Sequence, residues 1–228
     1  MKRRERNQKF AQKEQGPVLV AKTEKQKEYI RSVHENDMTV VLGPAGTGKT
    51  FVAAAMAAQW YSRGHVNKIY LTRPNVAAGR SIGFFPGTLE EKMAPWVAPY
   101  TDVMRQFLGS AVFDLALSKG NIQIVPFETM RGRSFSNAFV LLDEAQNTTP
   151  EEMKMFVTRI GENSRVIVNG DVRQSDLGST SGLTKIISMA YRYQLPVPVI
   201  EFGVDDIVRS DLCKMWITAW MEEDSVRK

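Results

Sequence analysis

The chain has 228 residues, of which 43% are hydrophobic, 24% charged and 9% aromatic. These ordinary globular values exclude a disordered chain, a collagen-like chain and a coiled coil. The single cysteine, Cys213, excludes an internal disulfide and a zinc site built on cysteines, and His34 and His65 lack metal-ligand spacing.

The net charge of +5 is unevenly distributed along the chain. Residues 1–14 carry six basic and two acidic side chains, whereas the remainder is close to neutral. We therefore expect residues 1–17 to form a basic flexible tail that either binds nucleic acid phosphates or is simply solvated. The longest apolar stretch, residues 51–60, is too short for a membrane span of about 20 residues. With no apolar run after the basic N-terminus, we expect a cytoplasmic protein that does not associate with membranes.

From residue 18 onward, strand and helix patterns alternate, and we expect one domain over residues 18–228. Apolar runs of strand length lie at residues 38–42, 68–72, 121–125, 138–142, 165–169 and 198–202. Helical patterns lie at residues 22–32, 48–63, 182–191 and 211–222. This alternation predicts an α/β fold with a mostly parallel sheet that helices cover on both faces.

Two further helices are expected from capping boxes, one at residues 88–91 and one at residues 149–152. The second has proline at its first helical position, which is a strong helix start. A proline-rich insertion is expected at about residues 79–100. Because Pro86, Pro95 and Pro99 lie in it, we expect the stretch to be broken into short helical pieces.

The segment after the first strand matches the phosphate-binding pattern G-x-x-x-x-G-K-[ST]. It also opens the next helix, which is the context that a P-loop requires. Its glycines let backbone N–H groups face phosphate, and the helix N-terminus adds a favourable dipole. We expect Lys49 to reach the β- and γ-phosphates of ATP and the Thr50 hydroxyl to ligate Mg²⁺. The expected nucleotide-binding residues are Gly43, Pro44, Ala45, Gly46, Thr47, Gly48, Lys49 and Thr50.

Two acidic residues, Asp143 and Glu144, follow the apolar strand at residues 138–142. The carboxyl end of such a strand faces the ligand crevice of an open α/β sheet. We expect Asp143 to hold Mg²⁺ through water, as a Walker B aspartate does, and Glu144 to act as general base on the attacking water. The plainer alternative is a solvated strand end.

A polar segment, residues 170–174, follows the strand at residues 165–169. Its place after another strand at the crevice suits a sensor of the γ-phosphate. We expect Gln174 to orient the attacking water, as glutamines do in GTPases. An ordinary turn is the alternative.

Six motifs occur together at residues 43–50, 72–74 (Thr-Arg-Pro), 83–87, 130–133, 142–147 (Leu-Asp-Glu-Ala-Gln-Asn) and 170–176. Jointly they resemble the PhoH family, and the resemblance covers about residues 18–221. It implies an ATPase with a RecA-like core close to superfamily 1 helicases. The chain ends soon after the core, as short phage-type members do, and the nuclease-like PIN domain of some relatives is lacking, so ribonuclease activity is not expected.

The resemblance also implies roles for two further residues. Gln26 resembles the helicase Q-motif glutamine that reads adenine; from the sequence alone, it is equally a polar residue on an exposed helix face. Arg209 resembles an arginine of the family's C-terminal motif. The histidine that usually follows it is replaced by Ser210.

Basic and aromatic residues near these motifs are candidates for nucleic acid contact, because basic groups track phosphates and aromatic faces stack on bases. For the aromatic residues Phe85 and Trp96, packing inside the protein is the alternative, and for Arg131 and Arg133 it is a solvated turn. The candidates are Arg73, Arg80, Arg131 and Arg133, with Phe84, Phe85, Trp96 and Tyr100 nearby.

Together these features predict a Mg²⁺-dependent ATPase that is coupled to RNA or single-stranded DNA, in helicase-like translocation or remodelling. A small-molecule P-loop kinase and a nucleotide-regulated, non-enzymatic scaffold are the alternatives. With one P-loop in the chain, a neighbouring subunit is expected to close the site and to contribute Arg209 in trans. We therefore expect a ring-like homo-oligomer, with a hexamer as the first expectation; an arginine in a surface ion pair is the alternative.

Overall fold

The structure is a computed structural model that describes residues 17–74, 89–175, 177 and 180–226. Its centre is a sheet of six parallel strands in the order β3-β2-β4-β5-β1-β6. All six strands lie where the sequence predicts them, within one residue at either end. They are β1 (Met38–Leu42), β2 (Lys68–Thr72), β3 (Ile122–Ile124), β4 (Ala138–Leu142), β5 (Arg165–Gly170) and β6 (Val199–Glu201).

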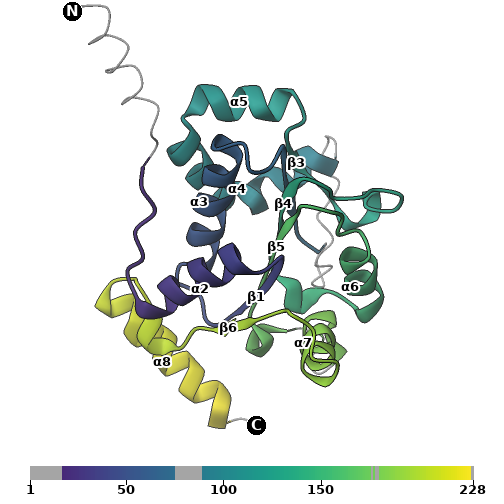
Figure 1. Cartoon of the computed structure of the whole chain (residues 1–228). Coiled ribbons are helices and arrows are strands. Elements are labelled where there is room, and N and C mark those ends of the chain that lie inside the picture. The colour runs from purple at the N-terminus through teal and green to yellow at the C-terminus, as the bar shows by residue number, and fades with distance from the viewer. Residues whose placement is uncertain (1–16, 75–88, 176, 178–179, 227–228) are drawn as a thin grey trace, which may run out of the picture.

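Helices cover both faces of this sheet (Figure 1), which confirms the predicted α/β class. One face carries α2 (Glu24–Glu35), α3 (Lys49–Ser62), α4 (Leu89–Leu108) and α5 (Ser110–Ser118). The other face carries α6 (Pro150–Val157) and α7 (Gly182–Arg192). The chain continues past β6 into α8 (Asp211–Val226), and short 3-10 turns are formed by η1 (Phe127–Thr129), η2 (Ala145–Asn147), η3 (Val172–Gln174) and η5 (Val204–Asp206).

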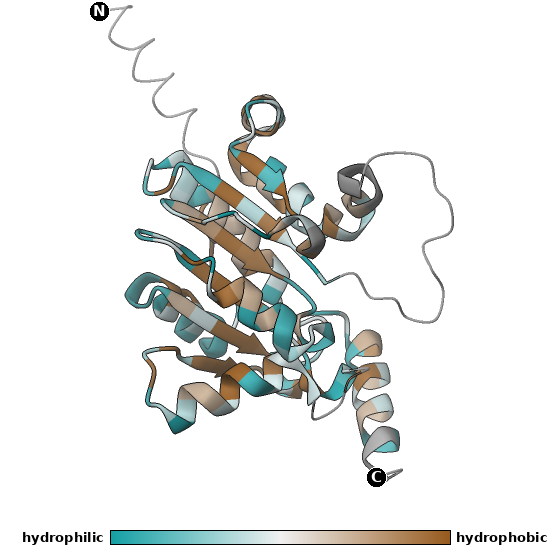
Figure 2. Ribbon diagram, turned by 90° about the vertical axis from the view of Figure 1, so that its right-hand side faces the viewer, coloured by the Kyte–Doolittle hydropathy of each residue, from teal (hydrophilic) through white to brown (hydrophobic). Residues whose placement is uncertain are grey.

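The strands read as continuous apolar runs because successive side chains are buried on opposite faces. Val41 and Ile167 pack under α2 to α5, whereas Val40 and Val168 pack under α6 and α7. Figure 2 shows these apolar strands enclosed between the helices. Two buried layers therefore hold the sheet, and its carboxyl edge is left free to carry polar residues.

Helix α4 corrects one prediction from the sequence. Residues 89–108 form one helix of 20 residues, with Pro95 and Pro99 inside it, instead of several short pieces. An interior proline costs about 3 kcal/mol because it removes a backbone hydrogen bond. Both prolines are exposed, so water can reach the carbonyls they leave free. The opposite face is buried at helical spacing, which outweighs this cost, through Met93, Val97, Tyr100, Met104 and Phe107.

Helix α5 is a further difference, because the sequence analysis does not predict it. It starts after Gly109, whose φ of +80° is in the region that favours glycine, and buries Phe113 and Ala116. The basic tail and most of the proline-rich insertion fall on residues 1–16 and 75–88, which lie outside the described residues.

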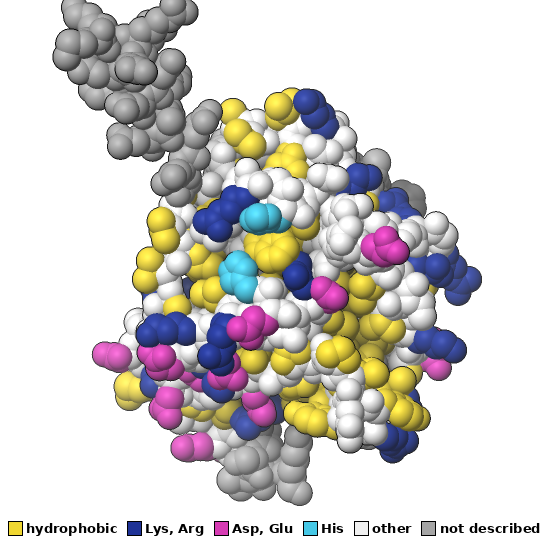
Figure 3. Space-filling model, viewed as in Figure 1, with side chains coloured by type: hydrophobic (Ala, Val, Ile, Leu, Met, Phe, Trp, Pro, Cys, Tyr) yellow, Lys and Arg dark blue, Asp and Glu magenta, His cyan; other side chains and the backbone are white. Residues whose placement is uncertain are grey.

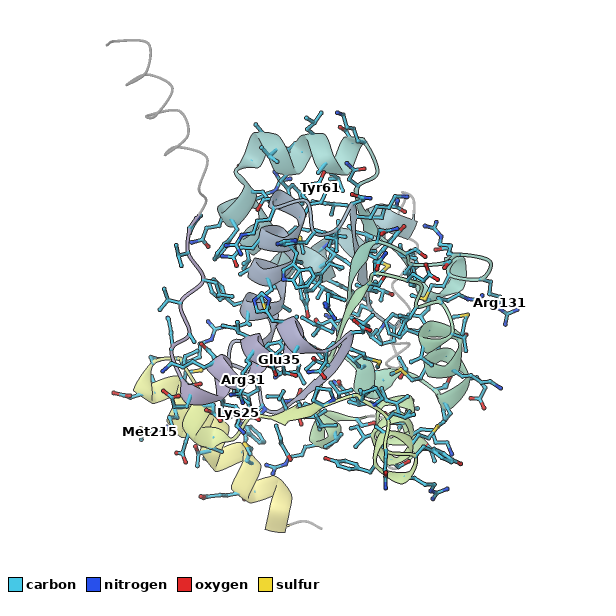
Figure 4. All side chains as sticks on the ribbon, viewed as in Figure 1. Lys25, Arg31, Glu35, Tyr61, Arg131 and Met215 are labelled. Carbon is cyan, nitrogen blue, oxygen red and sulfur yellow. The ribbon has the colours of Figure 1, made fainter. Side chains whose placement is uncertain are left out.

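Helix α8 exposes a stripe of large apolar side chains that are more than 60% exposed. They lie at helical spacing on one side of the helix, and the labelled Met215 points away from the body of the molecule (Figure 4). The stripe consists of Leu212, Met215, Trp216 and Trp220. None of the described helices is both long and apolar enough to cross a membrane.

The two histidines, although far apart in the sequence, both pack against Trp60, with ring centroids 5.7 Å (His34) and 5.4 Å (His65) from it. Figure 3 shows both histidines on one face of the molecule. Burial, followed by the nearby Arg63 and Arg165, lowers the pKa of His34. Among the described residues, no group of three or more His, Cys, Asp and Glu side chains is placed to hold a metal.

Candidate nucleotide site

A cavity of about 560 Å³ opens at the carboxyl edge of the sheet, where β1, β4 and β5 end. It brings together residues from five separate parts of the chain. Those with a predicted role are Gln26, Gly43, Ala45, Gly46, Gly48, Lys49, Thr50, Asp143, Glu144, Gln174 and Arg209. Of the predicted P-loop residues, Pro44 and Thr47 do not line it, and Thr47 is fully buried beneath the loop.

The P-loop folds between β1 and α3, as the sequence predicts. Gly48 caps the helix with a φ of +88°, and a Cβ at this position would lie 2.7 Å from Nε2 of Gln26. A side chain is therefore excluded both by backbone conformation and by space. The Thr47 hydroxyl donates to the carbonyl of Pro44 at 3.1 Å, which closes the loop on itself.

Lys49 donates from Nζ to the carbonyl oxygens of Gly43 (2.6 Å) and Pro44 (2.8 Å). Its ammonium group is thus held over the loop by neutral acceptors. Burial lowers the pKa of Lys49, while the carboxylates of Asp171, Asp143 and Glu144 oppose that shift. A partly buried cation whose partners are neutral carbonyls is suited to bind an anion that enters the cavity.

Gln26 is 3% exposed, so the alternative that places it on an exposed helix face is wrong. Its Nε2 donates to the carbonyl of Thr47 at 2.9 Å, and its Oε1 accepts from the backbone N–H of Lys22 at 2.8 Å. The amide has one further N–H and one further lone pair, and the residue lines the cavity. Gln26 therefore joins the segment before α2 to the P-loop, and its free groups match the edge of an adenine base.

Asp143 continues the ladder at the end of β4, where its N–H donates to the carbonyl of Thr72 at 2.9 Å. Burial and then the neighbouring Glu144 raise the pKa of Asp143, and the hydrogen bond from Tyr100 and the charge of Arg73 oppose this rise. Burial makes the Asp143 carboxylate costly to ionise when no cation is near. This carboxylate lines the same cavity as the Thr50 hydroxyl. These are oxygen ligands of the kind that Mg²⁺ prefers, so the residues present fit this ion.

Tyr100 reaches Asp143 from the buried face of α4. Its hydroxyl accepts from Nδ2 of Asn169, at the end of β5, at 3.0 Å, and its proximity to the Asp143 carboxylate helps to lower the pKa of that carboxyl. The ring is 2% exposed, and burial raises the pKa of its phenol well above the ordinary value. Tyr100, predicted only as an aromatic residue near nucleic acid, thus contacts the acidic centre instead.

Glu144 has different partners from Asp143. One carboxylate oxygen accepts from Nε2 of Gln146, and the other lies 3.8 Å from the Arg73 guanidinium. Its φ of +51° turns the backbone out of the strand and is uncommon for a residue with a side chain. Such backbone conformations concentrate at functional sites.

Gln146 connects Glu144 to the segment after β5. It is 1% exposed, and its Oε1 accepts from the N–H of Asp171 at 3.1 Å, while its carbonyl accepts from the Ser175 hydroxyl at 3.0 Å. Asp171 in turn accepts from the N–H of Arg173 at the start of η3. This network sets the position of Gln174, which is exposed and lines the cavity.

Arg209 lines the cavity of its own chain, and a Cβ on Gly46 would lie 2.9 Å from its Cγ. The neighbouring Val208 donates its N–H to the carbonyl of Gly46 at 3.0 Å. The segment before α8 is thereby attached to the P-loop. A role in cis therefore requires no second subunit, and the predicted role in trans stays a prediction.

The four arginines predicted to contact nucleic acid lie in different surroundings. Arg73 is partly buried, pairs with Glu144 and stacks over the Trp96 ring at 5.4 Å. Arg133 donates to the Thr129 carbonyl in its own loop and to the Gln123 side chain of β3. Arg131 is exposed and projects away from the body on the side opposite α8 (Figure 4). None of Arg73, Arg131 and Arg133 lines the cavity, and Arg73 reaches it only through its contact with Glu144. Arg80, Phe84 and Phe85 lie outside the described residues.

The sequence analysis missed four residues of this site, namely Tyr100 as a polar partner, Gln146, Asn169 and Asp171. Gln146 and Asp171 lie inside quoted motifs, so their positions gave a signal that was not used. Nothing in the local pattern around Tyr100 indicates that its hydroxyl meets β4 and β5.

Comparison with known proteins gives relatives along nearly the whole chain. A family model described as "PhoH-like protein" matches residues 18–221. The PhoH-like protein of Bacillus subtilis (strain 168) is 42% identical over 211 residues, which are 92% of this chain and 66% of the relative. Protein PhoH of Escherichia coli (strain K12) is 42% identical over 208 residues, 90% of this chain and 58% of the relative. The chain thus spans less than two thirds of the length of these relatives.

Two solved structures share the fold. The large terminase of bacteriophage HK97 superposes with a TM-score of 0.51 at 16% identity, over 81% of this chain and 39% of the terminase. The UvsW helicase of bacteriophage T4 superposes with a TM-score of 0.50 at 13% identity, over 82% of this chain and 62% of the helicase. These likenesses confirm the predicted RecA-like P-loop NTPase fold.

Proposed function

The chain belongs to the PhoH-like protein family, and from this membership and the cavity we propose that it hydrolyses ATP with Mg²⁺ and couples hydrolysis to RNA or single-stranded DNA. One observation carries the proposal. A single cavity contains most of the P-loop, a partly buried lysine and two adjacent carboxylates with different partners. These are the groups that phosphoryl transfer to water requires.

The chemistry follows from the place of each group. Backbone N–H groups of the P-loop and the Lys49 ammonium bind the β- and γ-phosphates and stabilise the charge that develops on them. Thr50 and Asp143 would hold Mg²⁺, which neutralises phosphate charge when bound. Gln174 orients a water for in-line attack on the γ-phosphorus, and Glu144 accepts its proton as ADP leaves.

Glu144 is better suited than Asp143 to accept this proton. Its carboxylate lines the cavity, and its hydrogen bond to Gln146 and its pairing with Arg73 hold it in place. Asp143 lines the same cavity as Thr50, whose hydroxyl would ligate Mg²⁺. The two carboxylates therefore have separate roles, one toward the water and one toward the ion.

Coupling to nucleic acid is supported by Arg73 and by the fold that the chain shares with the UvsW helicase of bacteriophage T4. Arg73 follows β2 at the carboxyl edge and touches the proposed base, so a phosphate that binds Arg73 acts directly on Glu144. Trp96 beneath its guanidinium offers an aromatic face next to that charge. The basic residues 1–14 would add sequence-independent affinity.

ATP turnover without any added acceptor, with and without single-stranded RNA and DNA, tests the proposal. We expect phosphate release that requires Mg²⁺ and rises when nucleic acid is added. Glu144→Gln should keep ATP binding and lose turnover, because an amide cannot accept the proton. Glu162→Gln, which changes an exposed carboxylate remote from the cavity, is the matched control.

Other outcomes would identify the alternatives. Phosphate transfer only in the presence of a small-molecule acceptor would indicate a kinase. ATP binding without turnover under every condition would indicate a regulated scaffold. Wild-type turnover by Glu144→Gln would show that the base is assigned to the wrong residue.

Arg73→Ala, compared with Arg131→Ala, separates the two predicted contact sites for nucleic acid. We expect Arg73→Ala to remove most of the stimulation by single strands, because this guanidinium alone of the two touches Glu144. Arg131→Ala should weaken binding slightly and leave stimulation intact. Equal effects of the two substitutions would make Arg73 an ordinary phosphate contact.

We also propose self-association into a ring, with a hexamer as the first expectation. Its support is the exposed apolar stripe on α8, which follows Arg209 directly in the sequence. Sedimentation of the wild type and of Trp216→Lys tests the assembly, which the lysine should weaken.

Mixing Lys49→Ala with Arg209→Ala subunits tests the role of Arg209 in trans. Recovered turnover supports that role, and no recovery assigns Arg209 to the cavity of its own chain.

A further inference from the structure

A second apolar surface lies at the end of α7, on a different part of the molecule from the stripe on α8. Its four large side chains are 38–71% exposed, and the two most exposed are tyrosines on either side of Arg192. Figure 3 shows hydrophobic side chains gathered over this region. We call this surface the α7 face, and it consists of Met189, Tyr191, Tyr193 and Leu195.

Hydrogen bonds fix the backbone of the α7 face. The N–H groups of Tyr193 and Leu195 donate to the carbonyls of Met189 (2.9 Å) and Ala190 (3.0 Å). Between them, Gln194 turns the chain with a φ of +50°. A closed turn of this kind loses little conformational freedom when a partner covers it, which favours binding.

The α7 face and the α8 stripe lie on segments of opposite formal charge. Residues 182–200 include the exposed Lys185 and Arg192 and no acidic residue, whereas α8 has four acidic residues and one basic residue. That basic residue, Lys214, lies 3.8 Å from the Asp205 carboxylate. Apolar patches with opposite charges around them are complementary, whereas like charges disfavour the pairing of one α8 with another.

The fold keeps these two surfaces of one chain apart. Helix α7 ends before the amino end of β6, and α8 begins beyond the carboxyl end of this strand. Figure 1 shows the two helices on opposite sides of β6. A contact between the two surfaces therefore joins two copies head to tail, and such a contact closes into a ring when the rotation allows it.

We propose that the α8 stripe of one subunit docks on the α7 face of the next subunit. The inference rests on the proposed self-association and names the two surfaces that form it. The other side of α8 lies next to the P-loop, because a Cβ on Gly46 would lie 3.7 Å from Cδ1 of Ile217. The contact between subunits therefore involves a helix that also adjoins the nucleotide cavity.

Two surface variants of the full chain, studied separately and mixed, test this contact. Trp216→Lys disrupts the stripe and leaves the α7 face intact, whereas Tyr191→Ser combined with Tyr193→Ser disrupts the α7 face and leaves the stripe intact. We expect each variant alone to associate at least about 10-fold more weakly than the wild type, because tryptophan and tyrosine anchors dominate most interfaces. Mixed in equal amounts, the two variants should sediment as dimers joined by one intact contact, and nothing larger should form.

A matched control removes two apolar side chains that belong to neither surface. Val112→Ser combined with Leu115→Ser changes exposed residues of α5 and should assemble as the wild type does. If the tyrosine variant fails to fold, Arg192→Glu replaces it. Its negative charge opposite the acidic α8 should weaken association, most strongly at low salt.

The mixture gives the decisive result. Variants that stay monomeric when mixed, at a concentration where the wild type assembles, overturn this inference alone. Wild-type assembly by the α7-face variant also overturns it, and a loss of affinity for single-stranded RNA in that variant would show that the α7 face binds nucleic acid instead. A wild type that is monomeric at every concentration overturns the proposed self-association as well, while its turnover of ATP is measured independently.

Discussion

The two sides of the cavity are built in contrasting ways. The P-loop side is one run of eight residues whose own hydrogen bonds, such as that from Thr47 to Pro44, determine its shape. The acidic side is two consecutive residues whose neighbours are Thr72 at the end of β2, the following Arg73, Tyr100 of α4 and Gln146 of η2. The P-loop thus combines local bonds with two from distant residues, Gln26 and Val208, whereas the side chains of Asp143 and Glu144 are oriented mainly by how other elements pack.

This difference predicts where each side is vulnerable. Substitutions in the P-loop should act on binding and leave the rest of the cavity intact. Substitutions around the carboxylates should act on turnover, on the metal requirement or on stability, even when the changed residue lies outside the cavity. Four substitutions test this contrast.

Lys49→Ala should have the largest effect and acts on the local side. The cation that binds the β- and γ-phosphates is removed, and charge-assisted contacts of about 1.5–3 kcal/mol correspond to about a 10–100-fold loss of ATP affinity. Isothermal titration with ATP and Mg²⁺ measures this loss. Lys185→Ala, an exposed lysine of α7, is the control. Unchanged affinity in Lys49→Ala would remove the P-loop from the phosphate site.

Gln146→Ala acts on the acidic side. It releases Glu144 and leaves the buried N–H of Asp171 without a partner, which costs about 1–3 kcal/mol of the free energy of unfolding. We expect turnover to fall about 10-fold while ATP affinity changes little, because a misplaced base raises the barrier by about 1.4 kcal/mol. Steady-state kinetics and urea unfolding measure both effects, and Gln106→Ala on the exposed side of α4 is the control. A loss of affinity with unchanged turnover contradicts the contrast.

Gln26→Ala acts on the P-loop side, because it removes the hydrogen bond from Gln26 to the Thr47 carbonyl. It leaves the Thr47 carbonyl and the Lys22 N–H without their partner, so we expect a loss of about 1 kcal/mol in unfolding free energy. If the free groups of Gln26 read adenine, ATP affinity should fall about 5-fold and GTP affinity should not fall. Competition binding with ATP and GTP measures the ratio. Equal losses for both nucleotides would limit Gln26 to supporting the loop.

Asp143→Asn should have the smallest effect on the nucleotide-free protein. It should raise the stability, whereas Gln146→Ala and Gln26→Ala should lower it. The pKa of Asp143 is raised in the folded state, so ionisation destabilises the fold as pH rises from the unfolded pKa through the folded one. An amide stays neutral, and we expect the nucleotide-free variant to melt a few degrees higher at pH 7, with little difference near pH 4. Melting curves at the two pH values measure this. A variant that is less stable at pH 7 would indicate that the carboxylate is well compensated without an ion.

Local patterns determined much of this protein from the sequence alone. Apolar runs bounded by polar residues located all six strands, and the capping box at Thr149 was predicted with its proline and is present. The P-loop and the two carboxylates were identified because each is a short, contiguous pattern at the end of a strand. Family membership followed from several such motifs in order.

Packing between distant segments decided the rest. Pro95 and Pro99 predicted a broken stretch, but a buried face spanning residues 93–107 holds α4 together. The hydrogen bond of Tyr100 joins residues 69 apart in the chain, that of Gln146 to Asp171 joins residues 25 apart, and that of Gln26 to Thr47 joins residues 21 apart. A sequence pattern reports which residues are near along the chain, whereas these contacts arise only when the sheet brings its strand ends to one edge.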